Sequence, residues 1–401
     1  MIYTFPEDFL FGTASAAAQI ETPVGHDWEN VKIFGGGRFT RAIDHELHRM
    51  DDAKIIASLG NAHRFSFDWA KLQTSPRSQL VPSVVEDYRN FMGALKDRGL
   101  HNMLTLHHFA SPNWFVKEGG WTNLESVLNL ADYARRVTID FGDLFDSCNP
   151  INEPDTYLYF GCLTGEGPPH KPLNIPLAKR MLGYLSQAHV AAHDAIRQIR
   201  PDIPVGVAKN TMIWSPESRW GLANKLVESF YNFYMDTIMD RFAVGEFLGI
   251  NYYGVIPWTP LPQTEAKRPG SIERLKRPHD DFWQLYPPGL IQVCQRYHER
   301  YPDKPIIITE NGTCTDDDEL RVDNLHQHLI AVHEAREMGM QITGYFVWTW
   351  ADNNEWASGL KPHFGLYRVN PITMERCAKR SAAVYAKISR DKCFEYTPKA
   401  V

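Results

Sequence analysis

The chain has 401 residues, of which 43% are hydrophobic and 22% are charged. This length and composition suit a folded protein with a sizeable core and exclude a disordered chain. The net charge of −6 excludes a strongly basic surface, so we expect neither a nucleic-acid nor a membrane partner. Aromatic residues make up 12% of the chain, and tryptophan and tyrosine stack on amphipathic ligands such as sugar rings as well as filling cores.

The beginning of the sequence and the cysteines bear on location and metals. Met1–Asp8 contains no basic or apolar stretch, so we expect no signal peptide, and no apolar run is long enough to span a membrane. The six cysteines are scattered without a C-x-x-C pair, which indicates reduced thiols in a cytoplasmic protein. His189 and His193 lack the glutamate of a zinc-protease motif, and the acidic run 316–318 stands where a helix begins. We therefore expect no metal and no cofactor.

Short β-rich runs recur along the chain, and helical patterns lie between them. The predicted strands are Phe9–Thr13, Ala62–Phe67, Asn102–His107, Cys148–Asn152, Pro204–Lys209, Phe247–Asn251, Pro305–Thr309 and Ile342–Trp348. Several of these runs are almost continuously apolar, which is typical of parallel strands buried on both faces.

Amphipathic patterns between the strands predict long helices. The predicted helices include Asp44–Leu59, Pro82–Arg98, Leu177–Arg200 and Asp318–Met338, with a glycine after each of the first two as a stop signal. Eight such alternations predict an α/β fold, a single (β/α)8 TIM barrel. No linker divides the chain, so we expect one domain over residues 1–401, with Pro257–Pro278 as a loop at the barrel rim.

Two glutamates stand directly after predicted strands. Glu153 follows the fourth strand in Asn152-Glu153-Pro154, and Glu310 follows the seventh. In a barrel of this kind both side chains would lie at the same mouth. One carboxyl group can protonate a departing glycosidic oxygen while the other attacks the anomeric carbon, so the pair indicates glycoside hydrolysis.

With these motifs in place, the sequence resembles glycoside hydrolase family 1, the β-glucosidase family, over essentially its whole length. The matching segments are Phe5–Glu21, His63–Trp69, Thr105–Phe109, Asn152–Pro154, Asn251–Tyr253, Glu310–Gly312, Phe346–Trp356 and Lys361–Leu366. The resemblance implies a retaining, exo-acting β-glycosidase. Its substrates would be β-glycosides or oligosaccharides with a terminal β-D-glucosyl residue, or also a β-D-galactosyl or fucosyl residue.

The resemblance also implies a role for each site residue. Glu153 would be the general acid/base and Glu310 the nucleophile, supported by Arg64 and Asn251. The substrate would be bound by Gln19, His108, Asn152, Tyr253, Trp348, Glu355, Trp356 and Phe364. A cation and a phenol near Glu310 would favour its ionised form, whereas burial would keep Glu153 protonated.

Some features bear on the substrate. The carboxylate of Glu355 would repel a sugar phosphate, which favours an unphosphorylated hexose. Loops shorter than is usual in the family, around Gly25–Arg41 and Pro257–Arg277, indicate an open side for the leaving group. Three alternatives stay open: an endo-acting barrel glycanase, a transglycosylase, and a non-catalytic sugar-binding barrel.

Overall fold

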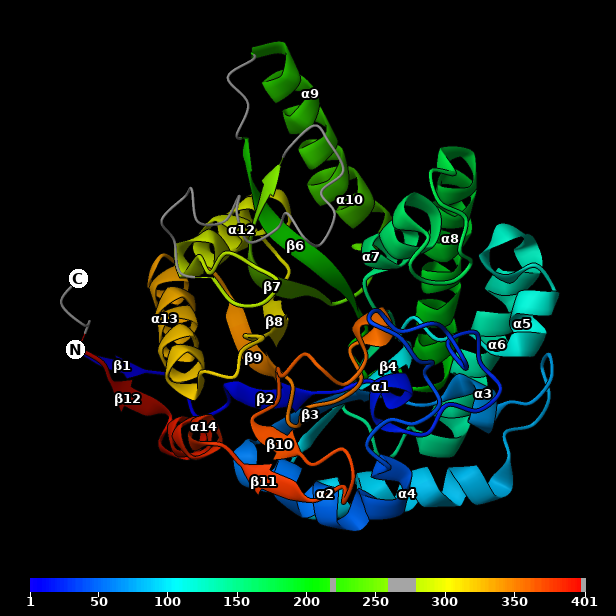
Figure 1. The fold of residues 1–401 in the computed structure, drawn as a ribbon, viewed down its shortest axis with the longest axis horizontal. Helices are drawn as coiled ribbons and strands as arrows, with labels where there is room; N and C mark the ends of the chain where they lie inside the picture. The colour runs from blue at the N-terminus through cyan, green and yellow to red at the C-terminus, as the bar shows by residue number, and fades with distance from the viewer. Residues whose placement is uncertain (217–220, 259–278, 398–401) are drawn as a thin grey trace.

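The computed structural model describes residues 1–216, 221–258 and 279–397, and its centre is a barrel of parallel strands (Figure 1). The strands are β2 (Leu10–Ala14), β3 (Ala62–Ser66), β4 (His101–His107), β5 (Ser147–Ile151), β6 (Gly206–Pro216), β7 (Phe247–Trp258), β8 (Ile306–Asn311) and β9 (Ile342–Trp348). They form one eight-stranded sheet in the order β5-β4-β3-β2-β9-β8-β7-β6. The predicted barrel fold is therefore confirmed.

The two end strands of this order, β5 and β6, close the barrel along a sparse seam. They meet only at isolated bridges, between Cys148 and Val205 and between Asn152 and Ala208. The backbone N–H of Glu153 donates to the carbonyl of Ala208 at 2.8 Å. The neighbouring pair, β6 and β7, is joined by a long parallel ladder that reaches Pro216 and Trp258. The seam is thus held by far fewer backbone bonds than the wall beside it.

Each of the eight predicted strands coincides with an observed strand, and β9 has the predicted bounds. The largest differences are in β6 and β7, which continue for seven residues beyond the predicted ends at Lys209 and Asn251. Pro257 was therefore wrongly predicted to begin a loop, because it pairs with Ser215 in the β6–β7 ladder. The rest of that predicted loop, residues 259–278, lies outside the described residues.

Helices surround the barrel (Figure 1). The long ones are α2 (His45–Leu59), α4 (Pro82–Lys96), α6 (Leu124–Phe141), α8 (Ile175–Ile199), α9 (Gly221–Asn232), α12 (Pro287–Arg300), α13 (Asp318–Glu337) and α14 (Arg380–Asp391). The four predicted helices are α2, α4, α8 and α13, and each agrees with its prediction within two residues at either end. Pro82 begins α4, where a missing N–H costs nothing.

Several short elements complete the fold. The helical turns are α1 (Ala17–Ile20), α3 (Trp69–Leu72), α5 (Asn113–Lys117), η1 (Gly120–Thr122), α7 (Pro154–Leu158), η2 (Tyr159–Thr164), η3 (Phe233–Thr237), α10 (Ile238–Phe242) and η5 (Trp356–Ser358). β1 (Ile2–Thr4) pairs with β12 (Cys393–Glu395), and β10 (Tyr367–Val369) pairs with β11 (Arg376–Ala378).

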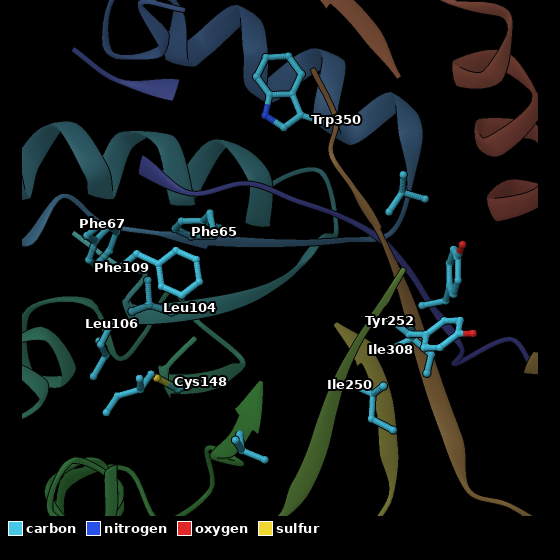
Figure 2. Close-up of a cluster of buried hydrophobic side chains, with 14 of the residues drawn as sticks. Phe65, Phe67, Leu104, Leu106, Phe109, Cys148, Ile250, Tyr252, Ile308 and Trp350 are labelled. Atoms are coloured by element: carbon cyan, nitrogen blue, oxygen red, sulfur yellow. The ribbon is translucent and has the colours of Figure 1, made fainter. Parts of the chain in front are cut away.

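The apolar core has two parts because successive side chains of a strand point to opposite faces of the sheet. The larger part lies between strands and helices and includes Phe65, Leu104, Ile250 and Ile308 (Figure 2). Phe65, for example, meets Phe91 of α4 edge to face, with ring centroids 5.5 Å apart. The smaller part includes Ala62, Met103, Phe247, Ile307 and Phe346, which alternate with the first set along the strands.

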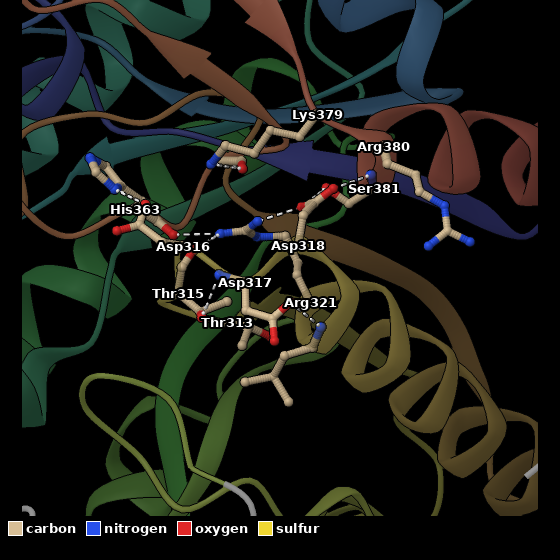
Figure 3. Close-up of polar contacts among 12 residues, drawn as sticks. Thr313, Thr315, Asp316, Asp317, Asp318, Arg321, His363, Lys379, Arg380 and Ser381 are labelled. Carbon is tan, nitrogen blue, oxygen red and sulfur yellow. Dashed lines mark hydrogen bonds and ion pairs between the residues drawn. The ribbon is translucent and has the colours of Figure 1, made fainter. Parts of the chain in front are cut away.

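The acidic run 316–318 stands at the start of α13, as the sequence predicted, and Asp317 caps this helix (Figure 3). The Asp317 carboxylate accepts hydrogen bonds from two backbone N–H groups in the first turn of α13. Asp318 bonds to Arg321 and to Ser381 of α14, and Asp316 bonds to His363. These contacts fasten α13, α14 and the chain near residue 363 to one another.

Two further predictions concern the thiols and the membrane. All six cysteines are free thiols, and four of them are buried. Among the helices of residues 1–216, 221–258 and 279–397, we find none with the length and apolar character needed to cross a bilayer.

Candidate active site

The register of the sheet brings the predicted site residues to one end of the barrel. Asn251 of β7 lies opposite Glu310 of β8, and Ala14 of β2 lies opposite both Arg64 and Trp348. The carboxyl ends of all eight parallel strands meet at this end. Segments that are hundreds of residues apart in the sequence thus contribute to one mouth.

Glu310 is buried and receives two strong hydrogen bonds. The Arg64 guanidinium donates to its Oε1 at 2.5 Å, and the Tyr253 hydroxyl donates to its Oε2 at 2.8 Å. Arg64 is itself fully buried, with its side chain only 1% exposed. Both oxygens of the carboxylate are therefore fixed by donors that favour its negative form.

Glu153 is buried on the other wall of the mouth. Its Oε1 accepts a hydrogen bond from the Asn251 amide at 2.7 Å. The residue has φ = 37° and ψ = 63°, a left-handed conformation that few non-glycine residues adopt, and it precedes the first turn of α7. This backbone geometry and the amide contact direct the carboxyl group.

A chain of hydrogen bonds connects the two glutamates. Arg64 donates from Nη2 to the Asn152 Oδ1 at 2.6 Å, and Asn251 donates to the same oxygen at 3.3 Å. The Asn152 amide in turn lies 3.1 Å from the His108 Nε2. Burial and the nearby Arg64 lower the pKa of His108 well below its usual value, so the imidazole is neutral and Nε2 acts as an acceptor.

The two carboxyl groups differ in their electrostatic surroundings. Burial raises the pKa of both. At Glu153 the negative charges of Glu310 and Asp155 raise the pKa further, well above the usual range. At Glu310 the contacts with Arg64 and Tyr253 oppose the effect of burial. Glu310 therefore loses its proton first, but burial outweighs these contacts and raises the pKa of Glu310 overall, so the preference for the ionised form is weaker than the sequence predicted.

Gln19 and Glu355 form a polar pair beside this network. The Gln19 amide nitrogen donates to the Glu355 Oε2 at 3.1 Å and to the Asn354 carbonyl at 3.0 Å, whereas its buried oxygen has no hydrogen-bond partner. Burial, with a further contribution from Glu310, raises the pKa of Glu355 to about 8. Near neutral pH this side chain is largely protonated and can donate as well as accept.

The predicted aromatic residues surround the same space. Trp348 and Trp356 both lie parallel to the His108 ring, with centroids 5.6 Å and 6.1 Å away. Phe364 lies edge to face with Tyr253 at 6.0 Å. All of the predicted site residues are thus brought to the barrel mouth.

The sequence analysis missed two aromatic residues of this site, Phe282 and Trp283. Trp283 stacks on Tyr253 with centroids 5.8 Å apart, and Phe282 stacks on Phe364 at 5.9 Å. The Asp280 carboxylate accepts hydrogen bonds from the backbone N–H groups of both. The sequence signal was an aspartate two residues before an aromatic pair, the pattern of a side-chain-capped turn.

A buried ion pair behind Glu153 was also missed. The Lys209 Nζ lies 3.2 Å from the Asp155 Oδ2, and both side chains are at most 1% exposed. A lysine among the apolar residues of the predicted strand Pro204–Lys209 was the only signal, and it did not reveal the partner.

Comparison with known proteins places this architecture in a family. The model of glycosyl hydrolase family 1 matches residues 1–250 and 243–394. The chain is 27% identical to a β-glucosidase of Agrobacterium sp., over 96% of this chain and 95% of that one. It is 29% identical to a bifunctional β-D-glucosidase/β-D-fucosidase of Bifidobacterium breve, over 98% and 99%.

A solved structure gives the same result. The β-glycosidase from Pyrococcus horikoshii superimposes with a TM-score of 0.87 at 32% sequence identity, and the match covers 99% of this chain and 97% of that one. The fold, the sequence match and the paired buried glutamates agree. The chain belongs to glycosyl hydrolase family 1 and is a β-glycosidase.

Proposed function

We propose that this enzyme is a retaining, exo-acting β-glucosidase, with Glu310 as the nucleophile and Glu153 as the general acid/base. The observation that carries the proposal is the unequal environment of the two buried glutamates. Arg64 and Tyr253 stabilise the charge of Glu310, whereas Glu310 and Asp155 disfavour a charge on Glu153. One carboxyl group is thus prepared to attack and the other to donate a proton.

In the first half of the reaction, a carboxylate oxygen of Glu310 attacks the anomeric carbon. The bond to the leaving-group oxygen breaks, and that oxygen takes the proton of Glu153. Asn152 is held by both Arg64 and Asn251, so its amide can contact the 2-hydroxyl of the sugar. This contact strengthens as positive charge develops on the sugar ring.

In the second half, Glu153 takes a proton from water, and the water oxygen attacks the anomeric carbon of the glycosyl-enzyme. The bond to Glu310 breaks, and the sugar leaves with its original β configuration. The released Glu310 carboxylate then accepts hydrogen bonds from Arg64 and Tyr253 again.

The remaining polar groups support a terminal hexose as the substrate. The unpartnered Gln19 oxygen and the partly protonated Glu355 offer both an acceptor and a donor to sugar hydroxyl groups. Because Glu355 is largely neutral near pH 7, its repulsion of a sugar phosphate is weaker than the sequence predicted. The Bifidobacterium relative supports a glucosyl and fucosyl range.

We further infer that residues 1–401 form one domain and that the protein acts in the cytoplasm on small β-glycosides. The six free thiols support the location. No observation in the described residues favours the endo-acting or non-catalytic alternatives.

Product stereochemistry tests the proposal. Proton NMR of an aryl β-glucoside reaction should show the β-anomer of glucose first, with the α-anomer appearing only as the sugar mutarotates. Initial release of the α-anomer would contradict a double displacement. Absence of any turnover on a panel of aryl β-glycosides would favour the sugar-binding alternative.

A further inference from the structure

The Lys209–Asp155 ion pair is enclosed completely by protein. The Lys209 ammonium donates to the Asp155 Oδ2 at 3.2 Å and to the Asn210 carbonyl at 2.7 Å. Its Nζ also lies 4.0 Å from the centroid of the Tyr234 ring. Burying an ion pair away from water is costly unless both charged groups have good hydrogen-bond partners. Removing one member of the pair is strongly destabilising, because the other charge is left buried without a partner. Such a pair is expected where a particular geometry must be held.

The pair lies at the β5–β6 seam, beside Glu153. Asp155 belongs to α7, two residues after Glu153, and Lys209 belongs to β6. Next to the pair, the Asn210 amide donates to the Thr156 hydroxyl at 2.9 Å. The backbone bond from Glu153 to Ala208 is a further connection. The ion pair therefore adds a side-chain link where the strands share only isolated bridges.

The same pair is tied to the residue that holds the Glu153 carboxyl. Lys209 and Asn210 lie opposite Ile250 and Asn251 in the β6–β7 ladder, and the Thr211 hydroxyl donates to the Asn251 carbonyl at 2.8 Å. Asn251 donates to Glu153. A shift of β6 relative to α7 would thus move both the backbone and the amide partner of Glu153.

We propose that the Lys209–Asp155 ion pair positions the acid/base Glu153, by fastening the β5–β6 seam and by balancing the charge beside that carboxyl group. This inference rests on the proposed role of Glu153. Asp155 and Lys209 are positioning residues, because neither lies among the groups that would meet the sugar.

The charge balance makes a signed prediction. The titratable and charged groups around Glu153 and this pair include Glu310 on β8, Tyr253 on β7, Lys209 on β6, Tyr234 and Asp236 on η3, Asp155 on α7, Tyr297 on α12, and Arg64 on β3, which reaches Glu310. Burial lowers the pKa of Lys209, and Asp155 opposes this effect. Asp155→Asn would remove a negative charge and leave the lysine unbalanced, so the pKa of Glu153 should fall.

The test is the pH dependence of kcat/KM for the full-length enzyme on two aryl β-glucosides, one with a good and one with a poor leaving group. In Asp155→Asn, the alkaline limb should move down by about one pH unit, and the loss at neutral pH should be about tenfold for the poor leaving group and much smaller for the good one. An unmoved limb in a folded Asp155→Asn protein would overturn the charge balance.

The double variant Asp155→Asn/Lys209→Met removes both charges and tests positioning separately, even if the single variant fails to fold. Its alkaline limb should return close to that of the wild type, while kcat/KM for the poor leaving group stays reduced. Wild-type kcat/KM on that substrate would show that the pair positions nothing.

Two controls separate this inference from a general loss of stability and from the proposed function. Asp52 of α2 pairs with Arg376 of β11, and their side chains are 1% and 7% exposed; Asp52→Asn should lower the Tm without moving the limb. An equal shift in that variant would overturn the inference. If the loss of kcat/KM in Glu153→Ala does not depend on the leaving group, the proposed function itself fails. If that loss depends on the leaving group but the loss in Asp155→Asn does not, only the ion-pair inference fails.

Discussion

The wall that carries Glu310 and the wall that carries Glu153 are built differently. Glu310 stands at the end of β8, which is joined by ladders to β7 and β9, and its carboxylate meets a buried cation and a phenol. Glu153 stands at the sparse β5–β6 seam, follows a strand instead of ending one, and receives an amide donor. The first wall stabilises a negative charge, and the second disfavours one.

This contrast shows how one barrel mouth prepares two identical side chains for opposite tasks. The difference does not come from burial, since both carboxyl groups are buried and burial raises the pKa of each. It comes from what each carboxyl group touches. Variants that remove one of these contacts should therefore reduce the difference in pKa between the two carboxyl groups.

The largest expected effect follows from removing the nucleophile. Glu310→Gly should lower kcat by about 10⁴-fold or more, because no covalent intermediate can form. Steady-state hydrolysis of an aryl β-glucoside measures the loss. Azide or formate should restore turnover by occupying the vacated position, and a glycosyl azide of inverted configuration should form. Failure of both anions to restore any activity would count against Glu310 as the nucleophile.

Removal of the proton donor should have a smaller and substrate-dependent effect. Glu153→Ala should lower kcat/KM by about 10²- to 10⁴-fold for poor leaving groups, the usual contribution of general acid catalysis. Strongly activated aryl glucosides should lose much less in kcat/KM, since their departure needs no proton. A Brønsted plot of log kcat/KM against leaving-group pKa should become steeper than that of the wild type. Equal losses for all leaving groups would contradict the assignment.

The phenol of the first wall can be removed alone. Tyr253→Phe should lower kcat/KM by about 10- to 100-fold, because one donor to the nucleophile is lost. The Tyr253 hydrogen bond lowers the pKa of Glu310, so its loss should raise that pKa and move the acidic limb of kcat/KM to higher pH. An acidic limb that stays in place or moves to lower pH would show that the phenol does not stabilise the ionised form.

The smallest effect should be one of stability, at Glu355. Its pKa is about 8 in the folded protein and near 4.5 when unperturbed, so between these values the folded state binds more protons than the unfolded state. Stability should therefore fall as the pH rises through this window. Glu355→Gln should reduce the fall in Tm between pH 5 and pH 8 by about 2–4 °C, measured by calorimetry. An unchanged pH dependence would mean that Glu355 titrates normally.

The sequence predicted the barrel because its strands are apolar runs whose order and spacing leave few alternatives. Ile342–Trp348 was predicted with its observed bounds. Pro204–Lys209 and Phe247–Asn251 were predicted too short. Beyond Lys209 and Asn251, the polar pair Asn210-Thr211 and Gly254 interrupt the apolar runs, but β6 and β7 still pair with each other.

The site was predicted where motifs mark strand ends and missed where contacts depend on the folded chain. Glu153 and Glu310 stand in recognisable motifs. Trp283 and the Lys209–Asp155 pair do not, because their partners lie far away in the sequence: Trp283 meets Tyr253, and Lys209 meets a residue 54 positions earlier. Residue types and spacing cannot reveal such long-range pairs.

The left-handed backbone of Glu153 has a consequence for the evolution of stability. A glutamate at φ = 37° is strained, and such strain costs about 1–3 kcal/mol. Glycine tolerates this conformation, so Glu153→Gly should lose general acid catalysis yet melt at a higher temperature than Glu153→Ala, which keeps the strained backbone. Selection for thermal tolerance alone would therefore favour the loss of this glutamate. Its presence measures how much folding stability the fold gives up for catalysis.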